Sequence, residues 1–356
     1  MERPYGRFHY LPTSLAAMGH EVHVFLCSHR HLPSVDLVRD DVHWISHDLR
    51  TLGIRKLWQR ARSQAEVVRP DWIIGMSDAW YGWLAQELSR RTDARLAVDA
   101  YDNYEAYMPW NLPLHWQWRR SIAMADVVTA AGPQLATLLD KHRPGKASTS
   151  IVPMAADPSF IPHDRLASRS ILGLPPDAPL IGYSGSWTGN RGTDCLLDVF
   201  RKVRGQYPEA RLVLTGRPPA HALTEFGVIA LGYLPDAQLP LALSALDVAC
   251  VMTADTTFGR YSYPAKLSEA MACRVPVVAS DTDAVRWMLG GREHHLAQLG
   301  GSEHFTQQIL AQLDNPRSDY GTCYEWRDSA RCLEALLLQQ PRMHAPSPHR
   351  RPDYPE

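Results

Sequence analysis

The sequence contains no apolar run near the ~20 residues that a membrane-spanning helix needs, and no secretory signal pattern. Its six cysteines are scattered, without the C-x-x-C spacing of metal and redox sites. We therefore expect reduced thiols, and neither a disulfide frame nor a metal site. The net charge is −1, which leaves no basic footprint for nucleic acid. These absences predict a soluble, cytoplasmic protein without a nucleic-acid partner.

What is present is an ordinary globular composition, 45% hydrophobic and 21% charged, in a chain of 356 residues that is long enough for two domains. β-Branched runs alternate with helical patterns of roughly 10–15 residues. This alternation predicts βαβ units and mostly parallel sheets, in which ligands bind beyond the carboxyl ends of the strands. The strands expected in the first half are residues 21–26, 42–45, 71–75, 95–99, 126–130 and 149–152.

The chain starts in or just before a helix that ends at Gly19, whereas an α/β domain normally has a strand ahead of that helix. We therefore expect the first strand of the N-terminal domain to be missing. A linker with two prolines around Phe160 indicates a domain boundary. The predicted units are an N-terminal domain (1–160), a C-terminal domain (161–320), a C-terminal helix (321–340) and a disordered tail rich in Pro, His and Arg (341–356).

Acidic and polar residues gather directly after the expected strand 95–99. Asp102, Asn103 and Glu105 are suited to accept hydrogen bonds from sugar hydroxyls, or one carboxylate is suited to act as a general base. The alternative is a polar loop whose Asp and Asn cap the next helix. The carboxylates of Asp99, Asp102 and Glu105 within seven residues exceed what capping requires, which favours a binding or catalytic site.

The segment that follows interleaves aromatic and cationic residues: Trp110, Trp116, Trp118, Arg119 and Arg120. This pattern suits a membrane interface or stacking on sugar rings. Tryptophan in a helix more often packs in a core or a domain contact, so that interpretation is favoured.

Two stretches of the second half indicate a phosphate site. The strand 180–184 runs into a glycine-rich loop, Gly185–Gly192, and then a helix, although the loop matches neither common nucleotide motif. Pro264 opens a helix on which Lys266 and Glu269, three residues apart, share one face. A cation, a carboxylate and the free N–H groups of a helix start suit a ligand with phosphates and hydroxyls. The alternatives are a ligand-free turn and a surface ion pair.

Five stretches resemble glycosyltransferases of the GT-B fold, family-4-like, also called glycosyl transferases group 1. They are similar to the family patterns "GHeV", "viPNGvD...F", "iGyvGrl...KGvd.Ll", "flGyvp" and "P.KllEamAcG.PVV", in residues 19–22, 151–160, 181–197, 231–235 and 264–278 respectively. They occur in the family's order. The resemblance implies an α/β protein with two Rossmann-like domains facing a cleft, the first on the acceptor side and the second binding the nucleotide sugar.

The resemblance also implies an activity: transfer of a sugar, of the hexosyltransferase kind, from a nucleoside-diphosphate sugar to a hydroxyl of a glycan or lipid-linked acceptor. The resemblance further implies that the reaction retains the anomeric configuration and needs no cofactor. Glu269 matches the glutamate that holds the donor ribose, and Arg191 matches the lysine that binds the diphosphate. The catalytic residues expected are Asp102, Arg191 and Lys266, and the donor-binding residues are Gly185, Ser186, Arg191, Tyr261, Lys266 and Glu269.

Four positions depart from the family pattern. Tyr261 replaces the first glutamate of Glu-x7-Glu, and Ser186 replaces the arginine of "Grl". Tyr101 replaces a histidine, and Arg274 replaces a glycine. Two alternatives therefore stay open: a catalytically impaired subunit that binds nucleotide sugars, and a nucleotide-sugar epimerase of the same architecture. A peripheral contact with the inner face of the membrane is also open.

Overall fold

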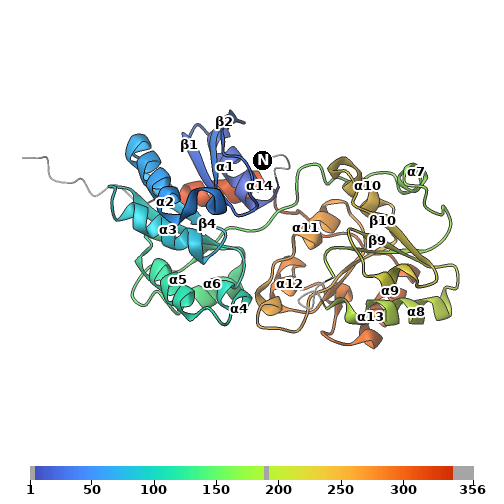
Figure 1. Ribbon diagram of the computed structural model, residues 1–356. Coiled ribbons are helices and arrows are strands. Elements are labelled where there is room, and N and C mark those ends of the chain that lie inside the picture. The colour runs from blue at the N-terminus through green and yellow to red at the C-terminus, as the bar shows by residue number, and fades with distance from the viewer. Residues whose placement is uncertain (1–4, 188–191, 340–356) are drawn as a thin grey trace, which may run out of the picture.

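The computed structural model describes residues 5–187 and 192–339. Two α/β domains lie side by side, and an extended segment between β7 (Ser150–Ile151) and α7 (Arg165–Ile171) joins them (Figure 1). The last helix, α14 (Trp326–Leu338), returns to the N-terminal domain. The predicted class of two Rossmann-like α/β domains is confirmed, while the residue limits assigned to the units stay predictions. No helix in the two described ranges combines the length and apolarity needed to cross a membrane.

The N-terminal domain carries two sheets, ordered β1-β3-β2 and β4-β5-β6-β7. All neighbours are parallel except β2 and β3. Among the described strands, β1 and β4 lie at the edges of their sheets and do not pair with each other. The alternating strands and helices predicted from the sequence therefore form two sheets. The elements are α1 (Arg7–Ala17), β1 (Val22–Ser28), β2 (Val35–Arg39), β3 (Val42–Asp48), α2 (Leu49–Val68), β4 (Trp72–Met76), α3 (Ala79–Ser89), β5 (Arg95–Ala100), α4 (Tyr104–Tyr107), α5 (Leu112–Met124), β6 (Val127–Ala130), α6 (Pro133–Asp140) and β7.

Helix α1 is anchored to this domain by a buried ion pair. The Arg7 guanidinium donates to both carboxylate oxygens of Asp99, at the end of β5, with N–O distances of 2.6 Å. Thr129 also donates to Asp99, and Arg7 reaches the carbonyl of Val152 at 2.7 Å. Both charged side chains are 1% exposed, and both have hydrogen-bond partners, which is the condition under which charges are buried in proteins.

The C-terminal domain has one parallel sheet in the order β10-β9-β8-β11-β12-β13. Counted within the domain this order is 3-2-1-4-5-6, the doubly wound arrangement, and its reversal point lies between β8 and β11. The elements are α7, β8 (Leu180–Ser184), η2 (Thr193–Cys195), α8 (Leu196–Gln206), β9 (Arg211–Thr215), α9 (Ala220–Leu223), β10 (Val228–Gly232), η3 (Asp236–Gln238), α10 (Leu239–Ser244), β11 (Val248–Val251), η4 (Gly259–Tyr261), α11 (Ala265–Ala272), β12 (Val277–Ser280), α12 (Asp283–Met288), η5 (Glu293–His295), β13 (Leu296–Ala297) and α13 (Ser302–Asp314).

The sheet of this domain is buried because its strands are short, continuous apolar runs. β8, β11 and β12 read Leu-Ile-Gly-Tyr-Ser, Val-Ala-Cys-Val and Val-Val-Ala-Ser, and both faces are covered by apolar clusters. Such runs are typical of parallel strands with helices on both faces. The carboxyl ends of β8 and β11 therefore meet at one edge, where a ligand site is expected.

The returning helix α14 completes the packing of α1. Leu11 and Leu15 of α1 pack with Trp326, Ala330 and Leu333 of α14. The Ser329 hydroxyl donates to the Pro153 carbonyl at 2.9 Å. The segment that joins the two domains is thus held at its start by α14 as well as by Arg7.

Candidate functional site

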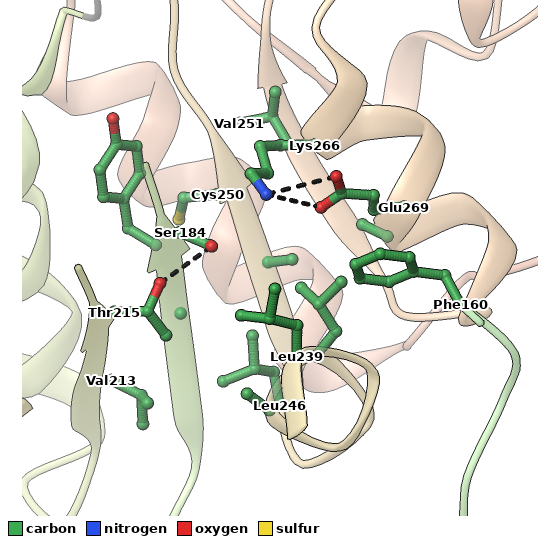
Figure 2. Close-up of a pocket in the computed structure, with 16 residues that line it drawn as sticks. Phe160, Ser184, Val213, Thr215, Leu239, Leu246, Cys250, Val251, Lys266 and Glu269 are labelled. Carbon is green, nitrogen blue, oxygen red and sulfur yellow. Dashed lines mark hydrogen bonds and ion pairs between the residues drawn. The ribbon is translucent and has the colours of Figure 1, made fainter. Parts of the chain in front are cut away.

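A small cavity lies at the reversal point of the C-terminal sheet (Figure 2). Its floor comes from the carboxyl ends of β8, β9 and β11, and α10 and α11 form its walls. Lys266 and Glu269 point toward its polar end, while Phe160 and Leu239 line its apolar part. The volume is about 20 Å³, room for roughly one water molecule. The cavity is therefore smaller than a nucleotide.

The polar end of the cavity is an ion pair on α11. Lys266 Nζ lies 2.9 Å from Glu269 Oε2 and 3.3 Å from Oε1, so the predicted i,i+3 pair on one helix face is confirmed. The Glu269 side chain is 2% exposed, whereas that of Lys266 is 36% exposed. Burial raises the pKa of Glu269, and the Lys266 ammonium opposes that shift. Glu269 is thus a buried hydrogen-bond acceptor, and its partner Lys266 is partly exposed to solvent.

A residue of the N-terminal domain also reaches this carboxylate. The Tyr5 hydroxyl donates to Glu269 Oε1 at 3.0 Å, across 264 positions of sequence. Burial and the neighbouring carboxylate raise the pKa of the Tyr5 phenol, so the group stays a hydrogen-bond donor. No pattern in the sequence pointed to Tyr5. The Tyr5 hydroxyl thus bonds to an oxygen of Glu269 that could otherwise accept a hydrogen bond from a ligand hydroxyl.

Gly182 in β8 and Gly185 in the loop after it are packed against neighbouring side chains. A Cβ at Gly182 would lie 2.1 Å from Leu246, and a Cβ at Gly185 would lie 2.9 Å from the Tyr183 hydroxyl, so neither position accepts a side chain without movement. The Tyr183 hydroxyl donates to the Ser186 carbonyl at 2.9 Å, and the Ser186 side chain is exposed. Arg191 lies outside the described residues.

The stretch before α11 contains Tyr261, which was predicted to bind the donor, and Tyr263, which lies at the contact between the domains. Tyr261 ends η4 and is half-buried. Tyr263, which sequence reasoning missed, donates to Gln134 Oε1 at 2.7 Å and accepts from the Gln134 N–H at 3.2 Å. Burial raises its pKa to about 12. The Tyr263 ring packs so closely on Gly132 that a Cβ there would lie 2.2 Å from it.

A second, larger cavity of about 510 Å³ lies between the domains. It is bounded by α4–α6 and by residues 256–258 of the C-terminal domain. Asp102 lines it, so the structure does not place Asp102 in the cavity of Lys266 and Glu269. Asn103 caps α4 by accepting from the Ala106 N–H at 3.3 Å, so the capping interpretation is right for that residue.

Glu105, at the edge of this second cavity, is paired. Arg119 donates to its two oxygens at 2.8 and 2.5 Å, and His142 Nε2 lies 3.8 Å away. Burial acts to raise the pKa of Glu105, but the hydrogen bonds and charge of Arg119 outweigh it and hold the pKa below its ordinary value. Glu105 is therefore a carboxylate anchored by Arg119, and Asp102 is the remaining acidic group of that loop in the cavity.

No cluster of three metal-ligating side chains occurs within residues 5–187 and 192–339. The fold and the two cavities define a class: two Rossmann-like domains of GT-B architecture, with a polar site at the sheet reversal point of the second. Family models agree: "Glycosyl transferase 4-like domain" matches residues 7–155, and "Glycosyl transferases group 1" matches residues 178–315. The chain belongs to this family-4-like group of glycosyl transferases.

Individual proteins are similar over different extents. D-inositol 3-phosphate glycosyltransferase of Stackebrandtia nassauensis is 28% identical over 261 residues, which are 65% of this chain and 58% of that protein. Sucrose-phosphate synthase of Thermosynechococcus elongatus has a TM-score of 0.71 at 19% identity, covering 93% of this chain and 90% of that one. HepE of Anabaena, solved with UDP and glucose, has a TM-score of 0.67 at 15% identity and covers 95% of both chains. The chain thus spans less than two thirds of that curated relative, and the solved structures show the fold.

Proposed function

We propose that this protein transfers a sugar, a hexose, from a nucleoside-diphosphate sugar to an acceptor hydroxyl, with retention of anomeric configuration. The observation that carries the proposal is the Lys266–Glu269 pair at the reversal point between β8 and β11. A buried carboxylate there is suited to accept hydrogen bonds from a ribose, and a solvent-facing ammonium is suited to a diphosphate. No cofactor other than the donor substrate, and a cytoplasmic location, are parts of the same proposal.

The chemistry asks the protein to stabilise charge on the leaving diphosphate. Lys266 supplies a cation that is already oriented by Glu269, with Nζ–O distances of 2.9 and 3.3 Å. Arg191, from the glycine-rich loop, is proposed as the second cation, since its planar fork binds phosphate oxygens in pairs. Gly185 and Ser186 are proposed to lie beside the diphosphate, because the backbone N–H groups of a glycine-rich loop can come close to phosphate oxygens.

The acceptor is proposed to enter from the larger cavity between the domains. Asp102 lies in that cavity and is proposed to orient the acceptor hydroxyl. The Stackebrandtia relative is named for an inositol phosphate acceptor, and HepE was solved with UDP and glucose. Those names support an acceptor rich in hydroxyls, either a glycan or a lipid-linked one, and a uridine nucleotide as the first donor to test.

Calorimetry with UDP, GDP and ADP and their hexose conjugates tests the donor site. We expect one nucleotide to bind to the wild type and Glu269→Gln to weaken that binding about 10- to 100-fold, the value of hydrogen bonds to a charged group. Glu225→Gln is the matched control, because Glu225 pairs with Arg201 in the same domain and does not line the cavity. Equal affinities of Glu269→Gln and the wild type would remove the ribose assignment.

Turnover and stereochemistry test the reaction itself. Hydrolysis of the best-bound donor, and its transfer to inositol phosphates, should fall at least about 100-fold in Arg191→Ala, as when a group that stabilises transition-state charge is removed. The anomeric proton of the product, followed by NMR from the first minutes, should keep the donor configuration. An inverted product would overturn retention while leaving transfer intact.

A second candidate, a subunit that binds the nucleotide without transferring sugar, is favoured by one observation. Tyr261 and Ser186 stand where the resemblance leads us to expect a glutamate and an arginine. Nucleotide binding that depends on Glu269, together with no turnover on any acceptor of the panel, would establish this candidate.

A further inference from the structure

Helix α5 exposes apolar side chains on the face that it turns to solvent. Leu112, Trp116, Arg120 and Met124 follow one another at i+4 spacing, so they form one stripe along the helix. Leu112 is 69% exposed and Trp116 is 59% exposed. The opposite face is buried through Trp118 and Ile122. The helix therefore carries apolar side chains on two sides; one side is buried, and the other is largely exposed, although the Met124 sulfur accepts from Gln86 of α3 at 3.3 Å.

The loop before α5 enlarges this surface. Trp110 is 76% exposed, whereas the Tyr107 ring, at the end of α4, packs against Phe258 of the C-terminal domain with 5.7 Å between ring centroids. We name the surface made by Trp110, Leu112, Trp116, Arg120 and Met124 the α5 face. A surface helix of a soluble domain normally presents polar groups, as α8 does with Arg201 and Lys202, both of which form ion pairs. A cluster of exposed aromatic side chains marks an interaction surface.

The charges of the α5 face are positive. The Arg120 guanidinium lies over the Trp116 ring, 5.4 Å from its centroid, and has no carboxylate partner in the described chain. Lys146 lies at the end of the stripe, where its ammonium donates to the Met124 carbonyl at 3.2 Å. The nearby Glu105 is already matched by Arg119. The surface is therefore complementary to negative charge.

We propose that the α5 face docks on a phospholipid bilayer that carries anionic headgroups. Amphipathic aromatic rings settle at the headgroup level, and cations beside them bind the headgroups. The same segment turns Pro109, His115 and Trp118 toward the larger cavity between the domains. A docked bilayer would thus lie beside the entrance of that cavity; α4 and α5 occupy one side of the N-terminal domain in Figure 1. The docking does not depend on the proposed transfer reaction.

Vesicle flotation of the full chain tests the proposal. The wild type should float with equimolar phosphatidylcholine and phosphatidylglycerol, and less with phosphatidylcholine alone or at high salt. Trp110→Ser/Trp116→Ser should reduce the partition coefficient at least about tenfold, since the buried apolar area is lost. Arg120→Glu should reduce it on anionic vesicles only. Nucleotide affinity and Tm should stay at wild-type values in both variants, because Trp110 and Trp116 are exposed and Arg120 is only half-buried.

The C-terminal domain offers a matched control. Phe226 and Tyr233 are 71% and 68% exposed, with Arg204 and Arg217 over their rings, yet they lie on the other domain. Phe226→Ser/Tyr233→Ser should float like the wild type. The proposal is overturned if the wild type does not bind either vesicle, or if the two tryptophan substitutions leave flotation unchanged. It is also overturned if those substitutions instead convert a dimer to a monomer in light scattering, since the α5 face would then cover a second copy.

Discussion

Each domain buries one carboxylate beside a cation, and the two pairs differ in what surrounds them. Asp99 and Arg7 are both 1% exposed, and Thr129 and the Val152 carbonyl complete their hydrogen bonds. Glu269 is 2% exposed, but its partner Lys266 is 36% exposed and lines a cavity. The first pair is closed on all sides, whereas the second opens to solvent.

This difference separates a structural role from the binding role that we propose for the second pair. The closed pair joins α1 to β5 and to the segment between the domains, so it stabilises the N-terminal domain. The open pair can exchange a partner, because Tyr5 and Lys266 both reach the surface. A buried carboxylate by itself is thus no guide to function; the accessibility of its partners decides.

The largest expected effect comes from breaking the closed pair. Arg7→Leu leaves the Asp99 charge buried without compensation, so we expect the free energy of unfolding to fall by about 3–5 kcal/mol. Urea titration followed by circular dichroism measures it. Arg7→Leu/Asp99→Leu should recover part of the loss. A loss below about 1 kcal/mol, the value of a surface pair, would contradict the closed-pair interpretation.

The open pair should make nucleotide binding depend on pH. Burial raises the pKa of Glu269, so the carboxylate takes up a proton as pH falls through that raised value; one of its oxygens then donates, and the proposed hydrogen bonds from a ribose to a charged acceptor are lost. Affinity should decline by up to about tenfold per pH unit below that pKa. Calorimetry across pH measures it, and Glu269→Gln should be flat in the same window. A wild-type affinity that does not change with pH would contradict the prediction.

A smaller effect is expected on stability. A folded-state pKa above the unfolded one means that the native protein binds more protons between the two values, so stability rises as pH falls through the raised pKa and levels off below the unfolded pKa. Glu269→Gln removes the buried charge and should raise the free energy of unfolding at neutral pH by up to about 1 kcal/mol. Urea midpoints at two pH values test this. Asp99→Asn should do the opposite and destabilise.

The smallest expected effect concerns Tyr5. Its hydroxyl holds Glu269 Oε1 at 3.0 Å, so Tyr5→Phe removes a competitor of the ribose, and nucleotide affinity should rise about two- to tenfold. Tyr10→Phe is the matched control, because Tyr10, on α1 just after Tyr5 in the chain, bonds to Asp157 and not to Glu269. Equal affinity of Tyr5→Phe and the wild type, or an equal gain in both variants, would show that Tyr5 does not compete.

Much of the fold could be predicted because its signals are local. β8 and the Lys266–Glu269 spacing follow from strand runs and helix periodicity within a few residues. β2 was not predicted, because Val35–Arg39 is a short, largely exposed strand at the edge of its sheet and its apolar pattern covers only a few residues. The division of the N-terminal strands into two sheets was also not predicted, because pairing joins segments that are distant in the chain.

The site divides in the same way. Contacts such as Tyr5 with Glu269 and Tyr263 with Gln134 join residues 264 and 129 positions apart, and no local pattern encodes them. The catalytic and donor-binding roles assigned from the sequence stay predictions; they concern Asp102, Gly185, Ser186, Arg191, Tyr261, Lys266 and Glu269.

The sequence by itself determined the order of strands and helices, the family and the pairing of Lys266 with Glu269, because these depend on neighbours in the chain. Only the tertiary structure decided that Arg7 and Asp99 are both buried and that Lys266 is partly exposed beside the buried Glu269. The tryptophans of α5 show the reason. Trp116 and Trp118 lie two positions apart in one helix, which puts them on different sides of it. Packing against Tyr104 and Gly82 buries Trp118, while Trp116 remains exposed.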